Sequence, residues 1–319
     1  MPRFLVHALI FALVQLGVLA ALWRSCPDDP DHYMAATVDK HARLRASAAS
    51  PRLIFVGGSS VGFSIDSRAF ADAPGLELEP VNMGLNDGLG LAFMLGEVQG
   101  QLRAGDVVVV APETHLLWTG SQDDAVWAVL QRRPASVACL AAGGPRAVAD
   151  VADQGLHFFA RKVRCAAHQM TTDRALPTIY RRSGFDAYGD FAAHRGLEAK
   201  PEAPLERRWP TPAQLERDPD FERNLDQLAG FAERCEAAGA RCFLAWCPTR
   251  AQSFADARAV YEHIEAQLRE RVALPMLEQP SEVALPETDF FDRGPHLTGA
   301  AAAVRSQRLA ARLEAALGE

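Results

Sequence analysis

The feature that most constrains this chain is a short apolar run that ends in two glycines and two serines, residues 53–60. Its first four residues, Leu-Ile-Phe-Val, predict a short buried strand. Gly57 and Gly58 allow a sharp turn, because they carry no Cβ atom. A residue directly after a strand of a parallel sheet faces the crevice where such sheets bind ligands. Ser59 is therefore a candidate nucleophile, although a serine at this place also fits a simple helix cap.

Apolar and amphipathic segments alternate along much of the remaining chain. Further strands are predicted over 76–81, 107–111 and 241–247. Helices are predicted over 89–102, around 225–235, over 254–268 and at the alanine-rich end to about 317. The run 107–111 is apolar throughout, as expected for a central parallel strand that is covered on both faces. The alternation predicts an α/β fold, a three-layer doubly wound parallel sheet.

The N-terminus carries an uncharged stretch, residues 4–23, that is long enough to cross a bilayer as a helix. We predict that residues 1–25 form a transmembrane anchor, and a cleaved signal peptide is the alternative. The short N-terminal tail is expected to stay inside, which places the body outside the cytoplasm. If the segment is instead a cleaved signal peptide, the protein is secreted.

The predicted α/β domain is built from two separated parts, residues 51–119 and 211–319. Residues 26–50 are polar and rich in alanine, and they are interpreted as a partly helical linker. Residues 120–210 break the alternation and are interpreted as a helical insertion, with helices near 123–133 and 145–169. This insertion either forms a lid over the site or is an ordinary peripheral subdomain.

Composition excludes some classes of function. The net charge is −7 and the basic residues are scattered, so no nucleic-acid partner is expected. The six cysteines form no C-x-x-C pair, and we predict neither a metal site nor a cofactor. Cys139 and Cys165 could form a disulfide in an oxidising compartment, but free buried thiols fit the sequence equally well.

One histidine near the C-terminus has the surroundings of a catalytic base. A serine hydroxyl becomes nucleophilic when a base takes its proton and a carboxylate orients that base. His296 follows Asp292 by four residues, and the intervening Gly294 and Pro295 make a loop more probable than a helix. We predict Ser59, His296 and Asp292 as a catalytic triad, with Ser60 as the alternative nucleophile.

Acyl transfer also needs hydrogen-bond donors for the oxyanion that develops on the substrate. The backbone N–H groups of Gly84 and Ser59 are the candidates, and Asn82 offers a side-chain amide. These residues follow the predicted strands, where the loops of a parallel sheet converge. For Asn82 and Gly84, plain turn chemistry is the alternative.

The order of these motifs resembles that of the SGNH (GDSL-like) hydrolase superfamily, in its membrane-anchored bacterial type. Gly57-Gly58-Ser59 is similar to the first conserved block, with glycine where aspartate is usual. Gly84 corresponds to the oxyanion glycine. Asp292 and His296 correspond to the last block, with one additional residue between them. The resemblance spans about 51–317 without 120–210, and it implies an SGNH/flavodoxin-like sheet.

The resemblance implies a serine hydrolase or acyltransferase that acts on ester bonds. It implies an esterase or O-acyl(acetyl)transferase on the periplasmic side of the inner membrane, acting on a glycan, another envelope polymer or an acylated small molecule. A membrane O-acyltransferase is a possible partner. Glu113 stands where the family has the asparagine that completes the oxyanion hole. Glu113 and Asn86 are candidates for binding substrate. The alternative is a catalytically degenerate domain that binds a glycan or the acyltransferase.

Overall fold

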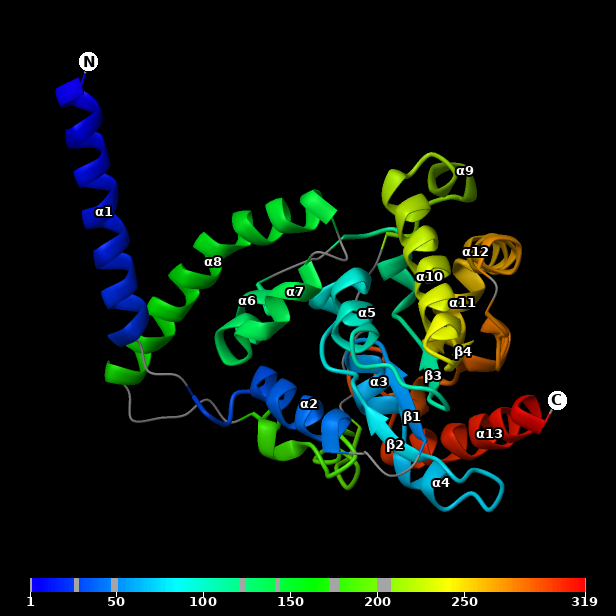
Figure 1. Ribbon diagram of the computed structural model, residues 1–319. Helices are drawn as coiled ribbons and strands as arrows, with labels where there is room; N and C mark the ends of the chain where they lie inside the picture. Colours follow the sequence, from blue (N-terminus) through cyan, green and yellow to red (C-terminus); the bar gives the residue numbers. More distant parts are fainter. Residues whose placement is uncertain are drawn as a thin grey trace.

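The centre of the molecule is a parallel sheet of four strands, in the order β2-β1-β3-β4 (Figure 1). The computed structural model describes residues 2–25, 29–46, 51–120, 124–140, 144–171, 178–199, 208–272 and 274–318. The strands are β1 (Arg52–Val56), β2 (Glu79–Asn82), β3 (Val107–Val110) and β4 (Arg241–Leu244). All three strand pairs are parallel. The predicted α/β class with a parallel sheet is therefore confirmed.

Helices cover both faces of this sheet, because alternate residues of each strand point to opposite sides. Ile54 and Val108 belong to one core together with Leu225. Phe55 and Val109 belong to a second core on the other face. The first core is covered mainly by α5 (Leu91–Gln99), α10 (Pro219–Ala237) and α12 (Arg258–Arg271). The second is covered by α3 (Ser59–Ser64), α4 (Ser67–Ala71) and α13 (Gly299–Gly318).

Some elements differ from their predicted bounds. The strand predicted over 241–247 ends at Leu244, after which the chain leaves β3. The helix predicted over 254–268 is divided into α11 (Ala251–Asp256) and α12, with Ala257 between them. Short elements complete this half: α9 (Pro212–Leu215), β5 (Thr249–Arg250) and β6 (Ala284–Leu285).

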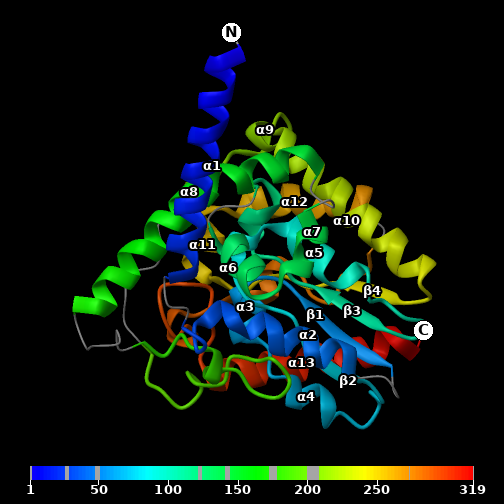
Figure 2. The same ribbon diagram turned by 60° about the vertical axis from the view of Figure 1, so that its left-hand side comes forward.

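The predicted insertion shares its core with the sheet domain. It contains α6 (Ala125–Arg132), α7 (Val137–Leu140) and α8 (Gly144–Thr171). Val126 and Val129 of α6 belong to the same core as Phe93 of α5. The segment 178–199 lies beside α2 in both views and packs Phe191 against Phe63 and Phe291 (Figures 1 and 2). The insertion therefore reaches the sheet domain at two separate places.

The stretch interpreted as a linker contributes a packed helix. Within the described part, 29–46, α2 (Ala36–Ala46) buries one face. Its buried residues include Leu44 and also Lys40 and His41. His41 Nε2 lies 2.9 Å from Glu97 Oε1, so this polar side chain has a partner inside the fold. Such polar residues gave the stretch its linker-like composition, although the fold satisfies them.

The N-terminal helix α1 (Pro2–Ser25) extends from the body and lies beside α8 (Figures 1 and 2). Its described apolar side chains are exposed, for example Phe4, Leu9 and Phe11 at 75%, 61% and 66%. No helix in the described part of the chain is long and apolar enough to cross a membrane.

Four cysteines are free thiols: Cys139, Cys235, Cys242 and Cys247. The side chains of Cys26 and Cys165 lie outside the described residues. The predicted pairing of Cys139 with Cys165 therefore involves a side chain that the structure does not describe, while Cys139 itself is a buried free thiol.

Candidate active site

Ser59 lies at the point where the order of strands reverses. From β1 the chain moves to β2 on one side and then crosses to β3 on the other. The loops after β1 and β3 diverge there, which opens a crevice at the carboxyl end of β1. Ser59 is the first residue of α3 and follows directly after Gly57 and Gly58. A Cβ atom on Gly57 would lie 2.5 Å from the carbonyl oxygen of Ala111, so this turn requires glycine.

The structure brings Ser59, His296 and Asp292 into one hydrogen-bonded row. Ser59 Oγ lies 2.9 Å from His296 Nε2, although 237 positions separate the two residues. His296 Nδ1 lies 2.9 Å from Asp292 Oδ2 and 3.0 Å from Oδ1. A carboxylate accepts only, so Nδ1 carries the proton and Nε2 is left to accept from the hydroxyl. This tautomer is assigned from the contacts.

Asp292 is held ionised by its neighbours. It accepts hydrogen bonds from Tyr180 (2.6 Å) and from the Gly294 N–H (2.8 Å) as well as from His296. Burial alone would raise the pKa of Asp292, but the hydrogen bond and charge of His296, with Tyr180 and Gly294, bring it to about 2. Asp292 therefore stays negative wherever His296 can act as a base.

A buried arginine fixes the loop that carries this pair. Arg250 donates to the carbonyl oxygen of Asp292 at 2.6 Å and to that of Gly294 at 3.1 Å. Its charge is paired with Glu287, 2.7 Å away. Fixing the backbone on both sides of Arg293 restricts how far Asp292 can move relative to His296.

The imidazole also packs against an aromatic ring. His296 and Phe63 stack with ring centroids 4.0 Å apart and an angle of 16° between the planes. Phe63 belongs to α3, the same helix that begins with Ser59. Nucleophile and base are thus held by one short helix in addition to their own hydrogen bond.

The alternative nucleophile does not contact the imidazole. Ser60 is 1% exposed, and its Oγ forms no hydrogen bond with any described residue. Ser59, by contrast, is half-buried and faces His296. Of the two serines, Ser59 is therefore the one whose hydroxyl proton can pass to the base.

Two of the three predicted oxyanion donors are already engaged. The Gly84 N–H donates to Asn82 Oδ1 at 2.8 Å. Asn82 is fully buried and donates its amide hydrogens to the Val61 carbonyl (3.0 Å) and to Asp190 (2.8 Å). These contacts fit the turn role that the sequence left open for both residues. The Ser59 N–H is at the first turn of α3, where no intrahelical acceptor exists, so it remains available.

A cavity of about 530 Å³ is lined by neighbours of the triad in the sequence, Arg293 and Pro295, although Ser59, Asp292 and His296 are not among its lining residues. Glu113, His115 and Arg250 also line it. Most of its lining residues are polar, and Trp209 and Tyr261 are its aromatic ones. Its volume suits a small ligand. Asn86 is not among the described lining residues; it accepts the Gly88 N–H at 2.8 Å and so caps a short turn.

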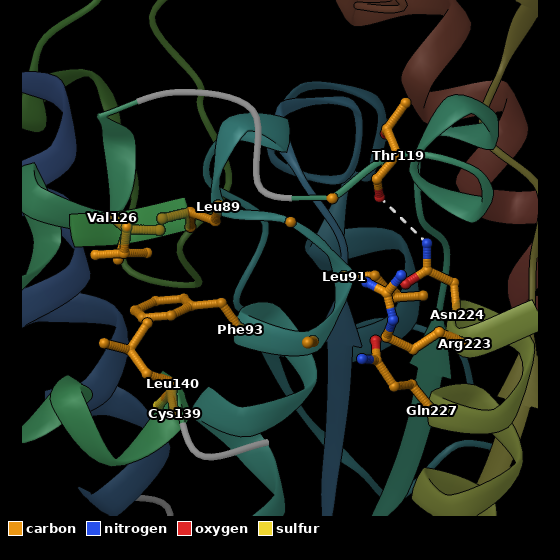
Figure 3. Close-up of a pocket in the computed structure, with 14 residues that line it drawn as sticks. Leu89, Leu91, Phe93, Thr119, Val126, Cys139, Leu140, Arg223, Asn224 and Gln227 are labelled. Atoms are coloured by element: carbon orange, nitrogen blue, oxygen red, sulfur yellow. Dashed lines mark hydrogen bonds between the residues drawn. The ribbon is translucent and has the colours of Figure 1, made fainter. Parts of the chain in front are cut away.

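A second cavity, of about 40 Å³, lies away from the triad. Figure 3 shows Phe93, Val126 and Leu140 around one end and Arg223 and Gln227 of α10 at the other. This volume holds no more than a few water molecules. The larger cavity is therefore the candidate substrate site.

Sequence reasoning did not find Tyr180, Arg250 or Phe63. Tyr180 lies 112 positions from Asp292, and Arg250 lies 42 positions from it, so no local pattern links them. The aromatic enrichment of the insertion was the single signal that could have directed attention to Tyr180. In the described ranges, no group of three His, Cys, Asp or Glu residues could hold a metal ion.

Comparison of the chain with protein-family models, curated proteins and solved structures found no match.

Proposed function

We propose that this protein is a serine esterase or O-acyltransferase of the SGNH type. The observation that carries the proposal is the unbroken row of hydrogen bonds from Ser59 through His296 to Asp292. This arrangement is the one that activates a serine hydroxyl for attack on an ester. The cavity beside it provides room for the ester and for the group that receives the acyl chain.

The proposed reaction has two halves. Ser59 Oγ attacks the acyl carbon while His296 Nε2 takes its proton, and His296 returns that proton to the departing alcohol oxygen. Water or an acceptor hydroxyl then attacks the acyl-serine and loses its proton to His296, which passes that proton to Ser59 Oγ as the bond from this oxygen to the acyl carbon breaks. Asp292 stabilises the imidazolium in both halves, and the Ser59 N–H donates to the oxyanion.

The proposed substrate carries a short acyl group such as acetyl, on a glycan, an envelope polymer or a small molecule. Both the acyl group and the class of acceptor come from the superfamily resemblance. Thr114, Thr249, Gln252 and Ser253 of the cavity lining offer hydrogen bonds to such a substrate.

We also propose that α1 attaches the body to a membrane on its extracytoplasmic side, with a secreted form as the alternative. The support is the exposure of the apolar side chains of α1. A membrane-bound O-acyltransferase remains a proposed partner of a body held in this way.

Ser59→Ala tests the proposed chemistry. In the full chain, p-nitrophenyl acetate hydrolysis should fall by roughly 10⁴-fold or more, because the nucleophile is lost. A fluorophosphonate should label the wild type once per chain and the variant not at all. Ser60→Ala is the matched control and should keep turnover and labelling, since its hydroxyl contacts no described partner. Equal turnover by Ser59→Ala would rule out the assignment.

The second candidate function is a non-catalytic binding domain. The observation that favours it is the engagement of the Gly84 N–H and of the Asn82 amide, which leaves few donors for an oxyanion. A folded wild type that no fluorophosphonate labels, but that binds an acetylated oligosaccharide by calorimetry, would support this function instead.

A further inference from the structure

The turn that carries Ser59 is held by an acidic side chain from the neighbouring strand end. Glu113 follows β3 by three residues. Its Oε2 accepts the N–H of Gly58 at 3.1 Å, and its Oε1 accepts the N–H of Ser60 at 2.8 Å. The two oxygens thus bind the backbone on either side of the nucleophile.

Gly58 leaves the space that this carboxylate occupies. A Cβ atom on Gly58 would lie 2.5 Å from Glu113 Oε2, 2.6 Å from Oε1 and 2.8 Å from the backbone nitrogen of Asp87. These distances are too short for any real side chain, so residue 58 must lack one as long as the carboxylate stays. Gly58 and Glu113 therefore form a complementary pair, and the missing side chain of one makes room for the other.

Charged neighbours surround Glu113 on the side away from the turn. Burial raises the pKa of the Glu113 carboxyl, and the nearby Asp87 raises it further. The hydrogen bond from the Ser60 N–H and the interaction with His115 lower it. Tyr33 also interacts electrostatically with Glu113. His115 Nε2 lies 3.3 Å from Asp87 Oδ2. A protonated carboxyl keeps one O–H donor and accepts less well, so the two accepted N–H groups favour the ionised form of Glu113.

We propose that Glu113, in its ionised form, is a positioning residue that fixes Ser59 in line with His296. This inference rests on the proposed function. Glu113 acts through the backbone of Gly58 and Ser60, and it holds the hydroxyl at the distance from which the base takes its proton. Protonation of Glu113 replaces two charge-assisted hydrogen bonds by weaker ones and loosens the turn.

The test is the pH profile of Glu113→Gln in the full chain. A glutamine has one acceptor oxygen, so its NH₂ group would face one of the two N–H donors. We expect kcat for p-nitrophenyl acetate to fall by about 10²-fold, with KM little changed, because the nucleophile is misplaced. The rate of fluorophosphonate labelling should fall in parallel.

The shape of the acid limb separates positioning from a structural role. In the wild type, protonation of the base His296 removes activity and protonation of Glu113 lowers it further, so the acid limb of log(kcat/KM) against pH should become steeper than slope one where Glu113 titrates. In Glu113→Gln the slope should stay at one. Glu278→Gln is the matched control. Glu278 is also buried, but it accepts hydrogen bonds from the backbone N–H of Trp246 at 3.2 Å and from Arg305 at 2.6 Å, and not from the turn that carries Ser59. It should lower the melting temperature without altering the shape of the acid limb.

Gly58→Ala provides an independent check of the pair. The new Cβ should displace the carboxylate, so adding Glu113→Gln to this variant should cost little more, whereas it costs about 10²-fold alone. Additive losses in the double variant would overturn the inference. So would a Glu113→Gln enzyme that is as fast as, or faster than, the wild type.

Failure of this inference and failure of the proposed function give different results. If the wild type is not labelled by a fluorophosphonate, the proposed function fails. Crystal structures of the wild type and of Glu113→Gln then test whether Glu113 positions Ser59. In that case a Ser59 Oγ to His296 Nε2 distance beyond hydrogen-bond reach in Glu113→Gln supports the inference. An unchanged distance of 2.9 Å overturns it.

Discussion

At the scale of residues, opposing effects decide the charge of Asp292. Burial favours the neutral acid, and the three donors His296, Tyr180 and Gly294 favour the carboxylate. The donors prevail because each contributes a direct hydrogen bond to the charged form. A negative Asp292 is what the imidazolium of His296 needs while the acyl group is transferred.

Asp292→Asn should therefore separate orientation from charge. The amide can keep a contact with His296 Nδ1, but it neither fixes the reactive tautomer nor stabilises the imidazolium. We expect kcat for p-nitrophenyl acetate to fall on the order of 10⁴-fold, with the fold retained. Steady-state kinetics and circular dichroism measure the two effects. A variant with wild-type kcat would show that His296 is not the base.

The same residue predicts a pH dependence of stability. The pKa of Asp292 is lowered from 3.8 to about 2 on folding. Its ionised form therefore stabilises the fold fully above the unfolded value, and this contribution is lost as the pH falls towards 2. The difference in unfolding free energy between wild type and Asp292→Asn, from urea denaturation, should shrink from pH 5 to pH 2. A constant difference would contradict the lowered pKa.

At the scale of elements, the insertion is tied to the sheet by a buried lysine. Lys40 of α2 donates to the carbonyl oxygen of Asn82 at 2.9 Å, at the end of β2, and to that of Gly189 in the segment 178–199. Its Nζ also lies 4.5 Å from the ring centroid of Phe185. One side chain thus connects three segments that are remote in the sequence and lie near the site.

The titration of Lys40 gives a prediction for this junction. Burial lowers its pKa from 10.5 to about 7, although Asp190, Asp186 and Glu97 act against this shift. Between these two pH values the unfolded chain binds more protons at Lys40 than the folded chain does. The free energy of unfolding therefore rises with pH, by at most about 1.4 kcal/mol per pH unit. The unfolding free energy of the wild type relative to Lys40→Met should rise from pH 7 to pH 10. A fall over this range would refute the lowered pKa.

At the scale of the whole molecule, α1 lies outside the packed cores. The apolar side chains that the structure describes in α1 are exposed, and among the described residues none of α1 belongs to a core of the sheet domain. Its removal should therefore leave the site intact, while an exposed apolar surface of this kind commonly marks attachment to a membrane or a partner.

A variant that lacks residues 1–28 should fold, keep the kcat of the full chain and stay in the aqueous phase of a detergent partition. The full chain should enter the detergent phase. Leu9→Glu combined with Leu13→Glu is the matched control for length, since both residues are exposed in α1, and it should behave as the truncated form does. A full chain found in the aqueous phase would contradict membrane attachment.

Three features follow from local patterns of residues: the parallel strands, the glycine turn before Ser59 and the proximity of Asp292 to His296. These features are local: apolar runs and period-3.6 helices follow from which residues face a core, and four residues of loop keep a carboxylate near an imidazole. The alternation of strands and helices was enough to predict the α/β class.

Which polar groups already have a hydrogen-bond partner depends on the packing of distant segments. Asn82 was a reasonable oxyanion donor until the fold supplied Asp190 as its acceptor, from 108 positions away. The sequence predicted a partly helical linker over 26–50 but not that α2 packs into the fold, because the partner of His41 comes from another helix. Hydrogen bonds between distant segments leave no periodic trace in a sequence, and they determine which donors remain free for chemistry.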